Sequence, residues 1–168
     1  MPETPLLTSA PSRGEVRDRI RRAFEAGTPP DADGVTMHRP CEECEELAGH
    51  LGGKRWTDLT PALVFKVRDA LPLLSRAAFR HYLPAFMTCA IDDREAVDIM
   101  WLSLVLNLKP RRGTDFEARV SAFTKEQSDA IASFLEWQRD EDRAELGELF
   151  DAKREGWFTK AIAYWKAR

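Results

Sequence analysis

The sequence has only three cysteines and no long run of uncharged apolar residues. An odd and small number of cysteines does not suit a disulfide framework and favours a reducing compartment. No segment approaches the roughly 18 apolar residues that a membrane span requires. The first residues also lack the basic region and apolar core of a signal peptide. We therefore expect a cytoplasmic protein without a membrane span.

The familiar catalytic signatures are missing as well. No serine lies in a nucleophile elbow, and there is no glycine-rich dinucleotide fingerprint. Residues 49–55 do not have the spacing of a phosphate loop, and residues 31–34 are not flanked by the ligands of a calcium loop. We therefore assign no catalytic or cofactor-binding residue, and we favour a non-enzymatic function over an enzymatic one.

The composition does indicate a folded domain. The chain has 168 residues, of which 43% are hydrophobic and 32% are charged, so a core and a soluble surface are both available. The net charge is only -3, and a weak overall field does not draw a protein to nucleic acid or to an anionic membrane. The sequence contains no indication of an oligomeric state.

Apolar residues recur with the period of a helix along most of the chain, as Val16, Ile20 and Phe24 do near its start. Such a period places these side chains on one face, which is then buried against other helices. The pattern predicts a mainly α protein, a single-domain irregular bundle of about six to eight helices. We expect this domain over residues 14–168, after a flexible N-terminal arm over residues 1–13.

Residues that favour helix ends mark where the predicted helices start and stop. Capping residues predict helix starts, and glycines predict helix ends or breaks. The expected starts are at Ser75, at Thr60 followed by Pro61, and at Thr124 paired with Gln127, and the expected ends or breaks are at Gly52, Gly53, Gly147 and Gly156.

Three segments are less regular. Pro84 lies inside a predicted helix and should kink or divide it. Asp92 and Glu95 fit a capping box that opens a helix through residues 97–108, which is apolar on all sides and is expected to lie at the centre of the core. Residues 116–123 alternate between apolar and polar side chains, so this part of the chain could form at most one short strand, for which the sequence offers no partner, or an extended segment.

A metal site is one hypothesis for function. His38, Cys41 and Cys44 have side chains that zinc prefers, with His81 or Cys89 as a further ligand. The alternative is that Cys41 and Cys44 are buried thiols, because they fall on the apolar stripe of their helix. The metal hypothesis implies a metal-binding domain or a metal-dependent enzyme.

Two clusters could bind a macromolecule. Trp157 and Trp165 lie in a C-terminal segment that mixes aromatic and cationic residues, which indicates either core packing or a partner-binding surface. Arginines at 17, 19, 21, 22, 111 and 112 indicate either a solvated face or a nucleic-acid site centred on the first helix.

The helix break expected at Pro84 could also shape a pocket. His81, Tyr82 and Phe86 flank this proline, and a broken helix leaves backbone groups that need partners. The alternative is a tight bend between packed helices.

Residues 56–59, 75–87 and 124–136 resemble a family of small uncharacterised bacterial proteins. The most distinctive element is Tyr82-Leu83-Pro84-Ala85-Phe86, and the resemblance extends from about Ile20 to Trp137. It implies no catalytic or binding residue. Abundant aromatic residues without a catalytic signature then favour a protein-interaction or regulatory module, with toxin neutralisation as one form of it. Metal binding and nucleic-acid binding are the alternative hypotheses.

Overall fold

The computed structural model describes residues 10–38, 41–93 and 100–168, and 72% of these residues are helical. The described chain has eight α-helices and four short 3-10 helices. The α-helices are α1 (Arg13–Ala23), α2 (Glu42–Leu51), α3 (Pro61–Lys66), α4 (Arg76–Asp92), α5 (Met100–Leu108), α6 (Thr114–Val120), α7 (Lys125–Leu146) and α8 (Ala152–Lys166). The 3-10 helices are η1 (Ala32–Gly34), η2 (Trp56–Asp58), η3 (Leu71–Leu73) and η4 (Gly147–Leu149).

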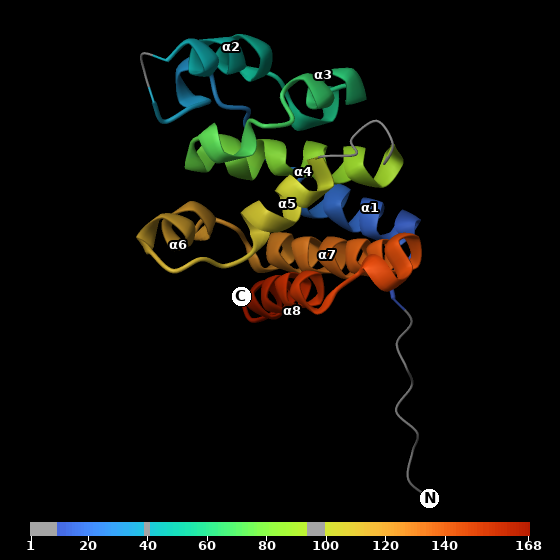
Figure 1. Cartoon of the computed structure of the whole chain (residues 1–168). Coiled ribbons are helices and arrows are strands. Elements are labelled where there is room, and N and C mark those ends of the chain that lie inside the picture. Colours follow the sequence, from blue (N-terminus) through green and yellow to red (C-terminus); the bar gives the residue numbers. More distant parts are fainter. Residues whose placement is uncertain (1–9, 39–40, 94–99) are drawn as a thin grey trace, which may run out of the picture.

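The helices form one irregular bundle, as the sequence predicted. Helices α7 and α8 pack side by side, and α1 packs on the other side of α7 (Figure 1). Helix α4 crosses between this group and the pair α2 and α3, which cover its far side. Helix α6 stands at one flank, where it contacts α4.

The central helix is α4, and not the segment 97–108 that the sequence favoured. Phe79, Tyr82 and Phe86 of α4 are fully buried, and the neighbouring positions on its other sides are buried too. Residues 97–99 lie outside the described residues, and α5 exposes 36% of Leu106. The neighbouring helices therefore do not cover all of the apolar side chains of α5.

The predicted capping signals are confirmed at three helix starts. The hydroxyls of Thr60, Ser75 and Thr124 accept hydrogen bonds from the backbone N–H three residues later. Thr124 and Gln127 complete the predicted capping box, which satisfies two N–H groups that the helix itself leaves unpaired. Helix α2 ends at Gly52, and α7 ends at Gly147, as expected.

Three local predictions are wrong. The segment 116–123 is not extended, because Phe116 and Val120 lie one turn apart on the buried side of α6. Asp92 is the last residue of α4 and does not cap a following helix; Glu95 lies outside the described residues. Gly156 lies within α8.

At Pro84 the sequence predicted either a kink or a division of the helix, and the structure excludes the division. Helix α4 continues through this proline to Asp92. A proline in a helix loses one backbone hydrogen bond, and burial of the residues on both sides of it outweighs that loss.

Candidate functional site: an arginine-lined cleft

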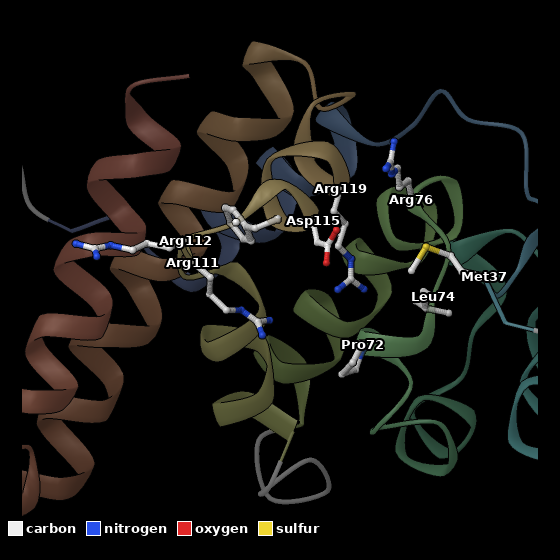
Figure 2. Close-up of a pocket in the computed structure, with 10 residues that line it drawn as sticks. Met37, Pro72, Leu74, Arg76, Arg111, Arg112, Asp115 and Arg119 are labelled. Atoms are coloured by element: carbon white, nitrogen blue, oxygen red, sulfur yellow. The ribbon is translucent and has the colours of Figure 1, made fainter.

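A cleft of about 370 Å³ opens where η3 and the start of α4 face α6 and the segment before it (Figure 2). Ten residues line it: Met37, Pro72, Leu74, Arg76, Arg111, Arg112, Gly113, Asp115, Phe116 and Arg119. Four of these are arginines and one is an aspartate. The cleft is therefore a cationic hollow on a protein whose net charge is -3.

Arg119 forms one wall of the cleft. Its guanidinium carbon lies 3.9 Å from the centre of the Phe79 ring, and its Nη2 donates to the carbonyl oxygen of Leu71. Burial, with a smaller contribution from the charge of Arg111, lowers the pKa of Arg119 to about 10. Its Nε is buried without a hydrogen-bond partner among the described residues. The side chain is thus rigidly placed and still has a free donor.

Arg111 and Arg112 come from the segment that leads into α6. Gly113 follows them with a φ of 125°, a conformation that glycine adopts without the cost of a side chain. Figure 2 shows Arg111 turned toward the centre of the cleft and Arg112 turned away from it. In the part of the chain that the structure describes, neither arginine forms an ion pair. Their charges remain available to an anionic ligand.

The lining also contains apolar residues. Leu74 and Phe116 are buried, whereas Met37 at the rim is 56% exposed. A cleft that combines guanidinium groups with an exposed, flexible thioether suits a ligand that carries both a negative charge and an apolar part.

Sequence reasoning identified only part of this site. Arg111 and Arg112 were noted as a charged pair, but Arg76, Arg119 and Met37 come from three other segments. The one signal in the sequence was the pairing of Phe116 with Val120 at helical spacing, which would have placed Arg119 on a helix.

Of the residues of the metal hypothesis, Cys41 and Cys44 lie at the start of α2, and His38 precedes this helix in the sequence. His38 is exposed, Cys41 is half-buried and Cys44 is buried. In the described ranges, no three His, Cys, Asp or Glu side chains come close enough together to hold a metal ion. His81 contacts the carbonyl oxygen of Lys54 through Nε2 at 3.2 Å, and Cys89 is buried in α4. Zinc binding by His38, Cys41 and Cys44 stays a prediction that metal analysis can test.

The group around Pro84 lies inside the core. Tyr82 and Phe86 are fully buried, and His81 is 9% exposed. The Tyr82 hydroxyl donates to the carbonyl oxygen of Leu51 at 2.5 Å, so it ties the end of α2 to α4. None of these four side chains lines the arginine cleft, and the predicted Pro84 pocket stays a prediction.

The two tryptophans of the predicted partner surface differ in exposure. Trp165 is fully buried and donates its indole N–H to the carbonyl oxygen of Leu108 at 2.8 Å. Trp157 is half-buried, with the ammonium groups of Lys109 and Lys153 at 5.5 Å and 5.4 Å from its ring centre. A partner at this surface would therefore contact Trp157 and not Trp165.

The arginines of the first helix make several internal contacts. Arg17 forms an ion pair with Asp92, and Arg19 donates to the Ser133 hydroxyl at 2.6 Å. Arg21 and Arg22 are exposed on the same helix. Nucleic-acid binding through α1 would thus rely mainly on these two residues.

The sequence predicted a protein without a membrane span. None of the helices in the described ranges has both the length and the apolar character needed to cross a bilayer.

The chain matches a protein family described as "Family of unknown function (DUF6714)" over residues 12–168. Since this match covers nearly the whole sequence, the chain belongs to that family. The expectation of a family without an established function is thereby confirmed. No match was found among curated proteins or among solved structures.

Proposed function

We propose that this protein is a protein-interaction module whose arginine cleft binds an acidic segment of a partner protein. The observation that carries the proposal is that four arginines and only one aspartate line a hollow of about 370 Å³, with Arg111 turned toward its centre. Arginine forms strong paired hydrogen bonds with carboxylates because its planar guanidinium matches their geometry.

The rigid placement of Arg119 supports this proposal. Its ring contact with Phe79 and its hydrogen bond to Leu71 fix the side chain before any ligand arrives. A group that is already ordered loses little conformational freedom on binding. Arg111 is exposed and extends from a short segment, so it can close on the ligand.

The apolar residues of the lining support a peptide over a bare inorganic anion. Met37 at the rim, together with Leu74 and Phe116, offers contact to the aliphatic part of an acidic side chain or to an adjacent apolar residue. An inorganic anion would use only the guanidinium groups and would leave this surface uncovered.

The proposal extends to a bacterial cytoplasm as the setting and to regulation of the bound partner as the role. Toxin neutralisation is one form of such regulation. A cationic cleft on a mildly acidic protein suits selective binding, because the net charge of -3 disfavours unspecific attraction to other anionic molecules.

Binding of defined peptides tests the proposal. We expect a fluorescent oligoglutamate peptide flanked by leucine to bind the wild-type protein at low salt, and oligoglutamine and oligolysine peptides of equal length not to bind. Arg111→Glu should reduce the affinity on the order of tenfold or more, as loss of a charge-assisted contact does.

Arg22→Glu is the matched control, because it reverses an exposed arginine on α1, away from the cleft lining. Equal loss of binding in Arg22→Glu and Arg111→Glu, or no binding of the acidic peptide by the wild type at low salt, would overturn the proposal. A single-stranded oligonucleotide that competes better than the acidic peptide would favour the nucleic-acid reading instead.

A further inference from the structure

Cys41 and Cys44 occupy special positions at the start of α2. Cys41 is the N-cap residue, with extended backbone angles of φ -157° and ψ 123°, and Cys44 lies in the first turn. Two residues separated in this way across a helix start have Cα atoms roughly 5–6 Å apart, which is the separation that a disulfide requires. The backbone therefore allows these cysteines to form a disulfide without a large rearrangement.

The spacing of the pair places the two side chains on one side of the helix start, because residues three positions apart in a helix are neighbours on its surface. The Cys41 side chain makes no capping hydrogen bond with the first turn of α2. A sulfur at the positive end of a helix is favoured in its thiolate form.

The two thiols differ in exposure in the way that a two-step exchange needs. Cys41 is half-buried, whereas Cys44 is fully buried. An external disulfide can therefore reach only the Cys41 sulfur. The Cys44 sulfur can then attack Cys41 from within the protein. The third cysteine, Cys89, is buried in α4.

We propose that Cys41 and Cys44 form a redox-active dithiol that reduces an external disulfide. The Cys41 thiolate attacks one sulfur of that disulfide, forms a mixed disulfide and releases the other sulfur as a thiolate, which takes up a proton. The Cys44 thiol gives up its proton, and its sulfur attacks the Cys41 sulfur. This second attack closes the Cys41–Cys44 disulfide and releases the remaining thiol. The protein loses two hydrogen atoms, that is two protons and two electrons, and the external disulfide gains them.

The charge around the pair restricts the substrate. Glu42, Glu43, Glu45 and Glu46 are all exposed on the same helix. An anionic disulfide is repelled by these carboxylates, whereas a cationic one is attracted. We therefore assign the dithiol to disulfides that carry positive charge near the sulfur atoms.

Mass spectrometry of the intact chain tests this assignment, with cystamine as the cationic probe and oxidised glutathione as the anionic probe. We expect the reduced wild-type protein to lose two hydrogens after treatment with cystamine, and peptide mapping to find Cys41 joined to Cys44. The reaction with glutathione disulfide should be slower on the order of tenfold, because of the four carboxylates.

Three variants separate the roles of the thiols. Cys44→Ser should accumulate the mixed disulfide on Cys41, Cys41→Ser should react slowly or not at all, and Cys89→Ser should behave as the wild type. A stable mixed disulfide on Cys41 in the wild type, or faster modification of Cys89 than of Cys41, would overturn the proposal. The wild-type measurement does not depend on whether the variants fold.

The metal content of the purified protein distinguishes metal binding by the cysteine pair from redox exchange. A full equivalent of zinc in the purified protein, with thiols that react only after chelation, would assign the pair to a metal and not to redox exchange. Loss of acidic-peptide binding by Arg111→Glu would be unaffected by either result, so this inference and the proposed function fail independently.

Discussion

Arg119 stacks its guanidinium group on the Phe79 ring at 3.9 Å and donates to the carbonyl oxygen of Leu71. Through these two contacts one side chain of α6 joins the central helix α4 to the short helix η3. The same side chain forms a wall of the cleft. Arg119 therefore contributes both to the stability of the fold and to the lining of the cleft.

Arg119→Met should lower the free energy of unfolding by about 1–3 kcal/mol, because the buried Leu71 carbonyl loses its donor and the ring loses its cation. Urea unfolding followed by circular dichroism measures this change. Arg112→Met is the control, since Arg112 is an exposed arginine in the segment that precedes α6, and it should change stability by less than about 0.5 kcal/mol. Equal stability of the two variants would contradict the structural role of Arg119.

Two glycines of the α2 region should respond in opposite directions to alanine. A Cβ at Gly52 would lie 2.7 Å from the Cα of Ala32 and 2.7 Å from the carbonyl oxygen of Ala48, so Gly52→Ala should destabilise by about 1–3 kcal/mol. A Cβ at Gly49 would meet nothing within 4 Å, and Gly49→Ala should stabilise α2 by roughly 0.5–1 kcal/mol. Thermal unfolding of the two variants checks both signs.

His81 should make stability depend on pH. Burial lowers the pKa of this imidazole, the nearby charge of Arg55 adds to the effect, and the carbonyl of Lys54 partly opposes it. Below about pH 6.5, the ordinary value for histidine, the unfolded chain binds a proton that the folded chain does not. The contribution of neutral His81 to the free energy of unfolding is therefore fully present above that pH. This contribution falls as the pH drops from the ordinary pKa to the lowered one.

The difference in unfolding free energy between the wild type and His81→Gln, measured from pH 5 to pH 8, isolates this effect from that of the carboxylates. Glutamine keeps a donor for the Lys54 carbonyl but does not titrate. We expect the wild type to lose stability relative to the variant as the pH falls. A difference that stays constant over this range would show that His81 is not the group responsible.

Replacement of Trp165 and of Trp157 should affect the stability of the fold to different extents. Trp165 is fully buried, so Trp165→Ala should cost about 3–5 kcal/mol of stability. Trp157 is half-buried, and Trp157→Ala should cost less and leave the fold intact. Near-ultraviolet circular dichroism and urea unfolding measure these changes. A larger loss of stability in Trp157→Ala than in Trp165→Ala would contradict the described packing.

Most of the helical framework could be predicted from the residues. Thr60, Ser75 and Thr124 start helices because each hydroxyl accepts a hydrogen bond from its own first turn, and this contact is local. The buried stripe of α1, with Val16 and Ile20, follows from helical spacing in the same way. Such features depend on neighbours within a few positions.

Predictions failed where distant segments decide the outcome. Residues 116–120 look extended by alternation, but the bundle buries Phe116 and Val120 on one side of a helix. Pro84 is a helix breaker by its own chemistry, yet packing on all sides keeps α4 continuous. In both segments the burial of apolar surface outweighs the local preference.

The sequence by itself determined that the chain folds into helices, where most of them start, and that two cysteines stand three positions apart. Only the tertiary structure decided that Arg76, Arg111 and Arg119 share one cleft and that Cys41 is more accessible than Cys44. The physical reason is range. Capping and periodicity act within one or two turns, whereas a cleft and the burial of a thiol arise from segments that meet only when the bundle has closed.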